Sequence, residues 1–314
     1  SNLAAILSAI AATNNDCTEV DTIAELQALV DQIVANAKAA ALAVITAYDG
    51  TNTAPTLADY ENAGIVVPAG TDIAAINSVI ATTAASGKDS IGEVQNILDT
   101  YAALLAGADG DASNNNVSLT ASQYALLGVT AIDSAAKASL LNDVIDGKSS
   151  ASVDTQAEIA ALASIVARIF EQAAGGTPNP PLTADDLAAL GLTGVTTDNL
   201  AAILAAIAAT ADNGSGVSSL SALQTITTDA ANAASAALAV ISAYDGNNTT
   251  PGVADYAAAG VTGVQAGNLA SINSVIAGLS SGATDTAAEV QAVVDDNRTN
   301  NNTEKGKENG VAIK

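Results

Sequence analysis

The sequence predicts an all-α protein, a tandem array of small three-helix bundle units that forms an elongated rod. Two observations lead to this fold class. The core material is aliphatic and rich in alanine, and one helical pattern with the same start and stop signals recurs along the chain.

The composition favours closely packed helices. The 314 residues are 49% apolar, yet they include only 6 Tyr and 1 Phe and no Trp or Met. Burial must therefore come mainly from Ala, Leu, Ile and Val, and alanine is the strongest helix former. This points to an all-helical protein.

A middle helix provides the clearest sign of repetition. It reads NLAAILSAI at 2–10, DIAAINSVI at 72–80, NLAAILAAI at 199–207 and NLASINSVI at 268–276, with a weaker copy, KASLLNDVI, at 137–145. The closing isoleucines lie 62 to 70 residues apart. A unit of nearly constant length is therefore written five times.

A short helix precedes the middle helix. Its copies are 57–64, 120–128, 183–191 and 253–260. Thr56, Thr120 and Thr183 lie three residues before Asp59, Gln123 and Asp186, the spacing of a capping box or a close relative. Gly64, Gly128, Gly191 and Gly260 follow as left-handed C-caps.

A long helix follows the middle one. Four S/T-x-x-E capping boxes open apolar patterns of helical period: Thr22 with Glu25, Ser90 with Glu93, Thr155 with Glu158, and Thr286 with Glu289. This capping role accounts for glutamates that could otherwise serve as catalytic carboxylates. Each unit is predicted to contain three helices.

A second level of duplication spans three units. LAVITAYDGTNTAPTLADYENAGI at 42–65 returns as LAVISAYDGNNTTPGVADYAAAGV at 238–261, 196 residues later. The first copy lacks its short helix and the last stops after Asp296, so we expect a segment of a longer array.

Stretches of Asp, Asn, Gly and Pro set the expected unit boundaries. These are a partial unit with the last two helices at 1–50, three-helix units at 56–107, 119–175 and 182–246, a partial or complete unit at 252–296, and a disordered tail or start of the next module at 297–314.

Charge limits the partners. The chain has 33 acidic and 9 basic residues, a net charge of −24, so it should repel nucleic acid and anionic membranes. No apolar run reaches the length of a membrane span, so no membrane insertion is expected, and any export signal should lie outside this sequence. An acidic, self-repelling surface suits an extracellular or cell-surface protein.

No catalytic or cofactor-binding residue is predicted, and the chain is not expected to be an enzyme. It has no His, which excludes a Ser-His-Asp triad and leaves Cys17 without a base. DGKSS at 146–150 has Asn142 where a phosphate loop needs glycine, so it is interpreted as a solvated loop, like SGKDS at 86–90.

One loop is a weak candidate for calcium. In ADGDASNNN at 108–116, Asp109, Asp111 and Ser113 have the alternating oxygens of a calcium loop. Asn114 replaces its glycine and Thr120 its glutamate, and a helix C-cap followed by a polar turn explains the same residues. No other cofactor is expected.

Aromatic residues recur in the short helix. Tyr60, Tyr124 and Tyr256 occupy the same place, which Leu187 takes in the fourth copy. Because leucine is tolerated there, burial of the ring is the favoured role.

The segments LADYENAGI, VADYAAAGVTGV, NLASINSVIAGL and AAEVQAVVD resemble the GA-like three-helix repeats of large bacterial surface adhesins, which are similar to albumin-binding GA modules. The resemblance covers the chain to Asp296 and implies an extracellular bacterial surface protein. No residue matches an albumin-binding epitope of that family.

A monomeric stalk or spacer is therefore the expected function. The residues that recur among the copies are the helix-capping residues and the apolar residues of the predicted core. The residues at positions expected to be exposed differ, with Glu61 replaced by Ala125 and Ala257. The alternatives are a binding module for a host protein or glycan, and a calcium-stiffened spacer.

Overall fold

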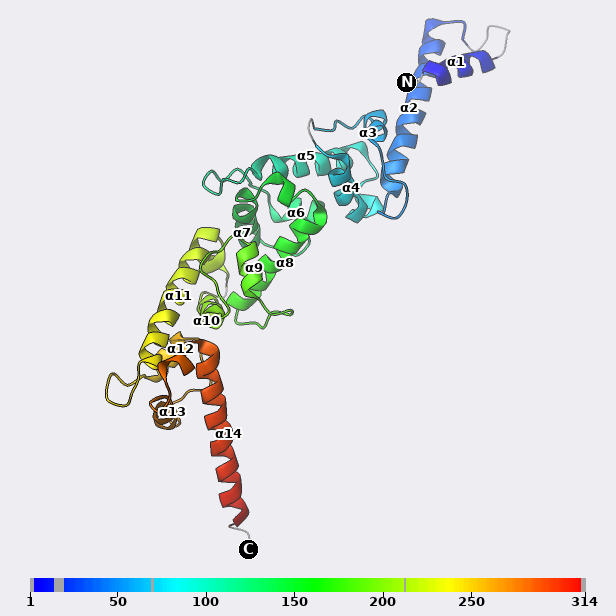
Figure 1. Ribbon diagram of the computed structural model, residues 1–314. Coiled ribbons are helices and arrows are strands. Elements are labelled where there is room, and N and C mark those ends of the chain that lie inside the picture. The colour runs from blue at the N-terminus through cyan, green and yellow to red at the C-terminus, as the bar shows by residue number, and fades with distance from the viewer. Residues whose placement is uncertain (1–2, 14–19, 69–70, 212, 312–314) are drawn as a thin grey trace. The chain divides into compact units, whose positions relative to one another are not determined.

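The computed structural model describes residues 3–13, 20–68, 71–211 and 213–311. Within these ranges the chain forms fourteen α-helices and four short 3₁₀-helices and no β-strand (Figure 1). The predicted all-α class is confirmed.

After a first middle and long helix, the described helices repeat the order short, middle and long, and in these later copies a 3₁₀ turn lies before the long helix. The short helices are α3 (Leu57–Ala63), α6 (Ala121–Leu126), α9 (Ala184–Ala189) and α12 (Val253–Ala258). The middle helices are α1 (Leu3–Ala12), α4 (Ile73–Thr82), α7 (Ala135–Asp146), α10 (Leu200–Ala208) and α13 (Leu269–Ile276). The long helices are α2 (Ile23–Ala47), α5 (Ile91–Gly107), α8 (Gln156–Ala173), α11 (Leu220–Ser242) and α14 (Ala287–Val311). The 3₁₀ turns are η1 (Ala85–Gly87), η2 (Ser150–Ser152), η3 (Ser215–Val217) and η4 (Ser281–Ala283).

The capping signals form the bonds that their spacing predicts. At the start of α5 the Glu93 amide donates to Ser90 Oγ at 3.3 Å, and the Ser90 amide donates to Glu93 Oε2 at 3.0 Å. The same reciprocal pair opens α2, α8 and α14. Each box satisfies two amides that the helix leaves free and contributes about 1 kcal/mol.

The short helices begin and end as their sequence indicates. Thr56, Thr120 and Thr183 make complete boxes with the side chain three residues on. After the helices, Gly64 and Gly191 have φ of 88° and 96°. Such left-handed backbone is strained for residues with a Cβ, so glycine ends the helix and sends the chain back toward the core.

The chain divides into two compact units, each of which contains more than one of the repeats. Below, the first unit and the second unit are these two, and a single repeat is called a copy. One contains residues 1–138 and 145–163, and the other contains 139–144 and 164–314, so the division falls within α7 and α8.

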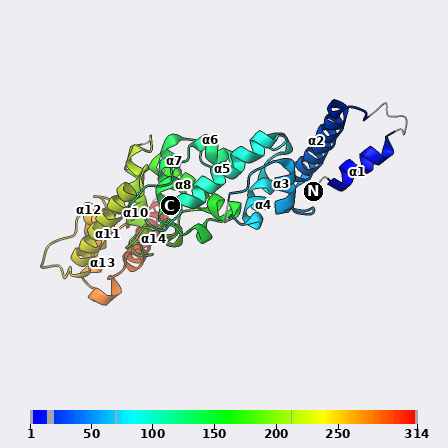
Figure 2. The same ribbon diagram turned by 90° about the horizontal axis from the view of Figure 1, so that it is seen from above.

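In the second unit, one core cluster joins two consecutive copies of the sequence. Helices α11, α12, α13 and α14 lie together in both views (Figures 1 and 2). The cluster comprises Ala237 and Ile241 of α11, Tyr256 of α12, Ala259 and Val261 after it, Ile272 and Ile276 of α13, and Val290 and Val294 of α14. The end of one long helix is therefore core material for the next copy.

The first unit uses the end of α2 in the same way. Ala41 and Ile45, on its last turns, are buried, although the earlier part of the helix is exposed or half-buried. Beside Ile45, Thr46 Oγ1 donates to the Lys88 carbonyl at 2.9 Å, which ties α2 to the loop before α5.

Helix α14 runs on through 297–311, where the sequence predicted either disorder or a new module. This segment has no apolar period because it is polar on all sides. A helix can continue past its packed part without an apolar stripe, so the absence of a period did not exclude it.

Helix α2 is long and apolar enough to cross a membrane by length and composition, with a mean hydropathy of 1.5 in its most apolar window. No membrane span was expected, since no uninterrupted apolar run reaches the required length; within α2 the charged residues Asp31 and Lys38 break the run. Only 11% of that window is buried, whereas a core helix of a soluble protein that passes the same test is mostly buried. A signal sequence also passes this test, and α2 additionally has a capping box and a packed end.

Candidate functional site

The predicted calcium-loop residues lie together in the turn after α5, but their oxygens bond to the turn itself. Asp109 Oδ1 accepts the Asp111 amide at 2.9 Å, and Asp111 Oδ1 accepts the Ser113 amide and hydroxyl at 3.0 and 2.6 Å. Asp109 Oδ2 accepts the side-chain amides of Asn114 and Asn116 at 2.8 and 3.0 Å. These bonds lower the pKa of Asp109, the Asp111 amide contributing most. In the described ranges no three His, Cys, Asp or Glu side chains converge in a way that could hold a metal ion.

The same turn is fastened to the DGKSS loop, which corrects one prediction. Asp146 was expected in a solvated loop, yet it is fully buried. Its carboxylate accepts the amides of Asn115 and Asn116 at 3.1 and 2.7 Å. An isolated β-bridge joins Asp109 to Ser149 beside it. Asp146 therefore anchors the turn after α5.

The SGKDS loop also departs from the solvated interpretation. Lys88 is only 2% exposed, and its Nζ donates to the carbonyls of Ile80, at 2.7 Å, and Tyr48. Loss of solvent lowers the pKa of this ammonium group. The residues at the same position in later copies are also buried: Val153, Val217 and Thr284. The side chain at this position is therefore part of the core.

A buried hydrogen-bond network recurs behind the short helix. Tyr60 Oη donates to Asn77 Oδ1 at 2.7 Å, and Asn77 Nδ2 donates to the Pro55 carbonyl at 2.8 Å. In the last copy Tyr256 donates to Asn273 at 2.6 Å, and Asn273 donates to Pro251 at 2.8 Å. Burial of the tyrosine rings is confirmed. Desolvation, the largest cause, raises the pKa of Tyr256 to about 12 and that of Tyr60 further.

A glutamine on the long helix clasps the chain just after the short helix. The Val66 amide donates to Gln95 Oε1 at 2.8 Å, and Gln95 Nε2 donates back to the Val66 carbonyl at 3.0 Å. Gln224 does the same with Thr193, and Gln291 with Thr262. One side-chain amide thus satisfies both backbone groups of a residue that lies outside any helix.

An ion pair joins α8 to the start of α9 in the second unit. Arg168 forms a two-pronged contact with Asp186, NH1 to Oδ2 at 2.9 Å and NH2 to Oδ1 at 2.8 Å. NH1 also donates to the Pro181 carbonyl at 3.1 Å. Chiefly because of the Arg168 hydrogen bonds, the pKa of Asp186 falls to about 2. The pair fixes the turn that connects two copies.

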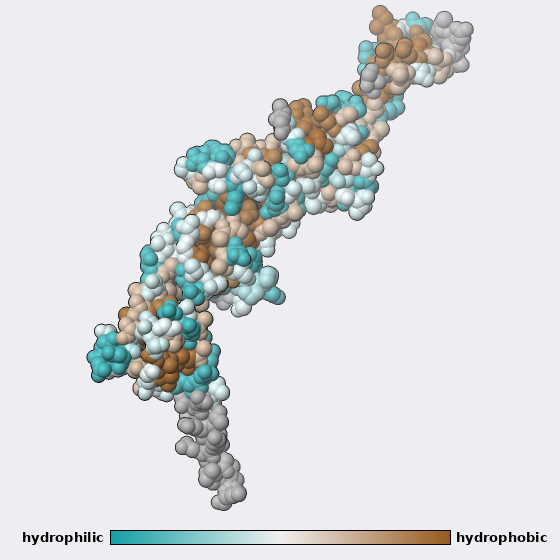
Figure 3. Space-filling model, viewed as in Figure 1, coloured by the Kyte–Doolittle hydropathy of each residue, from teal (hydrophilic) through white to brown (hydrophobic). Residues whose placement is uncertain are grey.

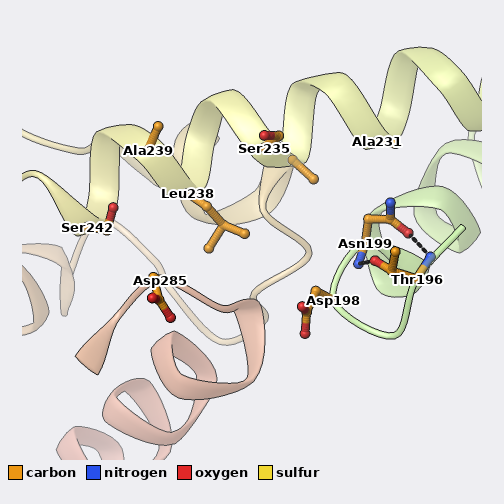
Figure 4. A pocket seen from close by; sticks show the side chains of 10 residues that line it. Thr196, Asp198, Asn199, Ala231, Ser235, Leu238, Ala239, Ser242 and Asp285 are labelled. Carbon is orange, nitrogen blue, oxygen red and sulfur yellow. Dashed lines mark hydrogen bonds between the residues drawn. The ribbon is translucent and has the colours of Figure 1, made fainter. Parts of the chain in front are cut away.

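The second unit also contains a cleft of about 410 Å³ between α11 and the loops that precede α10 and α14 (Figure 4). Small side chains of α11, Leu238, Asp198 and Asp285 line it. The pKa of Asp285 is raised, first by its hydrogen bond with Glu289 and also by repulsion from Asp198. The cleft is acidic and has two serines, but the chain has no histidine to activate them.

The contacts described above hold the fold together. Each joins a side chain to backbone, to another side chain of the same turn or to a neighbouring element, and none of these contacts brings a nucleophile to a base. Cys17 lies outside the described residues. Comparison with protein-family models, curated proteins and solved structures finds no match to this chain.

Sequence reasoning missed the partners of the recurring residues. Asn77 and Asn273 appear in the sequence only as letters of the middle-helix motif, and no role was predicted for Gln95. The available signal was their return at equivalent positions: Asn at 77, 142 and 273, and Gln at 27, 95, 224 and 291.

Proposed function

We propose that the chain is a non-enzymatic stalk or spacer, a tandem array of three-helix units on a bacterial surface protein. The observation that carries this proposal is the core cluster of α11 to α14, in which the end of one long helix completes the core of the next copy. Shared helices couple neighbouring units and resist bending, as in other repeat proteins.

The recurring polar contacts support a mechanical role. The tyrosine–asparagine network, the glutamine clasp and the capping boxes each return in several copies, and each holds one part of a unit to another. The residues that recur among the copies are therefore those that hold the fold together.

Exposed positions offer little for repeated recognition. The same exposed place on the short helix holds Glu61, Ala125 and Ala257, so the charged side chain of the first does not recur in the other two. A binding array would need anchors such as Tyr or Arg at matching exposed sites, because a few residues provide most of the binding energy. The tyrosines of the short helices are buried instead.

The resemblance to GA-like repeats of surface adhesins supports a place outside the cell, and the net charge of −24 suits a soluble extended segment. The acidic cleft is the feature that favours the alternative, a binding module for a host protein or glycan.

Calorimetric titration separates the two functions. A spacer should bind serum albumin, immunoglobulin and fibronectin more weakly than about 10 μM at physiological salt, roughly −7 kcal/mol. Saturable one-site binding tighter than this would contradict the proposal. Asp198→Asn and Asp285→Asn, which leave the cleft's shape intact, would then show whether the cleft is the site.

A further inference from the structure

The N-terminal copy presents an apolar face that has a covered counterpart in the last copy. The core cluster of α11 to α14 takes four of its members from a middle and a long helix: Ile272, Ile276, Val290 and Val294. Their counterparts in the first copy, by the position of the motif and of the capping box, are Ile6, Ile10, Leu26 and Val30. With Leu3 and Leu7, these four residues are called the open face.

The open face is exposed where its counterparts are not. Leu26 is 38% exposed, whereas Val94, Ile159, Leu223 and Val290, at the same position in the other copies, are each 0% exposed. Ile6 and Ile10 are half-buried, although the matching isoleucines of α4, α10 and α13 are at most 1% exposed. Figure 3 shows apolar residues gathered over α1 and the adjoining part of α2.

The last copy shows what covers such a face. The other members of its cluster are Ala237 and Ile241, at the end of the preceding long helix, and Tyr256, Ala259 and Val261, in and after the short helix. The fourth copy shows the same approach, since Gln172 Nε2 near the end of α8 donates to the Leu204 carbonyl of α10 at 3.1 Å.

We propose that the open face binds the end of a long helix and the short helix of a further copy of this unit, joined on the N-terminal side of α1. The inference rests on the repeat array proposed above. It also predicts which kind of copy can cover the open face, because the incoming short helix must pack against Leu7.

Two positions vary together among the copies. In the second and fifth copies, tyrosine on the short helix donates to asparagine on the middle helix, as Tyr60 does to Asn77. In the third copy, Tyr124 and Asn142 stand at these positions. In the fourth copy both are leucine: Leu187 is fully buried and Leu204 is half-buried.

Leu7 stands at the asparagine position, and it is 57% exposed. A tyrosine buried against Leu7 would leave its hydroxyl without the acceptor that Asn77 or Asn273 provides, which is costly. A leucine would bury apolar surface against apolar surface. The incoming short helix should therefore carry leucine, as in the segment that ends with α9.

Duplication of residues 155–198 in front of Asn2 of the full chain tests this proposal. Asn199 and Asn2 stand at the same position of the motif, so the fusion restores the spacing of α8, α9 and α10. Amide hydrogen exchange of Leu3–Ala12 should slow at least tenfold. Leu187→Asp in the added segment alone is the matched control and should abolish this protection.

The pairing rule has its own test. Leu187→Tyr in the added segment should lose most of the protection, and Leu7→Asn added to it should restore protection, as in the Tyr60–Asn77 pair. Unchanged exchange in the fusion, or equal protection with Leu187→Asp, would overturn the proposal. So would a dimer of the original chain, seen by sedimentation, that Leu7→Glu abolishes, because a second copy would then be the occupant. These results do not depend on whether the chain binds host proteins.

Discussion

The hydroxyl of Tyr60 and the side-chain oxygen of Asn77 lie 2.7 Å apart in the interior, and the same asparagine reaches the carbonyl of Pro55. This network holds three segments together: the loop that enters the short helix, the short helix and the middle helix. The network returns in the last copy as Tyr256 and Asn273, whereas the fourth copy has leucine at both positions.

Loss of the Tyr60 hydroxyl should therefore be costly. Tyr60→Phe should lower the free energy of unfolding by about 1–2 kcal/mol, because Asn77 Oδ1 would be left buried without a donor. Urea unfolding followed by circular dichroism measures the change. The double variant Tyr60→Leu with Asn77→Leu, the pair found in the fourth copy, should cost less than the two single changes combined. Strict additivity would contradict the coupling.

The glutamine clasp should contribute in a way that an ordinary surface glutamine does not. Gln95→Ala should cost about 1 kcal/mol and speed hydrogen exchange at Val66, since both backbone groups of Val66 lose a partner. Gln27→Ala is the matched control, because Gln27 stands at the same position of the first copy and, among the residues that the structure describes, bonds to Asp31 on its own helix and to no clasped segment. Its cost should stay below about 0.5 kcal/mol. Equal effects of the two variants would refute the role of the clasp.

The ion pair between Arg168 and Asp186 should make stability depend on pH. The pKa of Asp186 falls from 3.8 to about 2, so the folded state binds its proton less readily than the unfolded state. The resulting stabilisation is present above pH 4 and lost as pH falls from about 4 to 2, and it amounts to about 1–2 kcal/mol. Arg168→Met should remove most of this loss between pH 4 and 2. If the free energy of unfolding falls equally in the two proteins as the pH is lowered from 4 to 2, the ion pair is not the cause of the pH dependence.

A buried hydroxyl in α11 is a site where the protein can be stabilised. Thr227 is fully buried, and within the described part of the chain its Oγ1 has no hydrogen-bond partner. Val294 stands at the same position of the last copy and is also fully buried. Thr227→Val should therefore raise the free energy of unfolding by about 1 kcal/mol, measured in urea. Thr225→Val, on an exposed turn of the same helix, should change it by less than about 0.5 kcal/mol. A destabilised Thr227→Val protein would show that the hydroxyl has a partner.

Local signals were enough to predict the helices. Capping boxes such as Ser90 with Glu93, and glycines such as Gly64, specify helix ends through bonds made within a few residues, so the sequence shows them directly. The burial of Tyr60 followed from its replacement by Leu187.

Contacts between distant residues could not be predicted in this way. Burial of Lys88 depends on the carbonyls of Ile80 and Tyr48, which only the folded chain brings together. Asp146 looked like part of a solvated loop because its partners, the amides of Asn115 and Asn116, lie 31 and 30 residues away. Internal repetition was the one signal for such contacts: the asparagine and glutamine recur at matching positions, but their recurrence does not show what they bind.

Small-angle X-ray scattering of the monomer tests the central claim, an array of coupled units that acts as a stiff spacer. A rod of stacked units should have a radius of gyration well above the roughly 20 Å of a compact chain of this length. Its pair-distance distribution should have a long tail, and both should be unchanged between 50 and 500 mM salt. A radius near 20 Å, or one that shrinks steadily as salt screens the acidic surface, would contradict the stiff array.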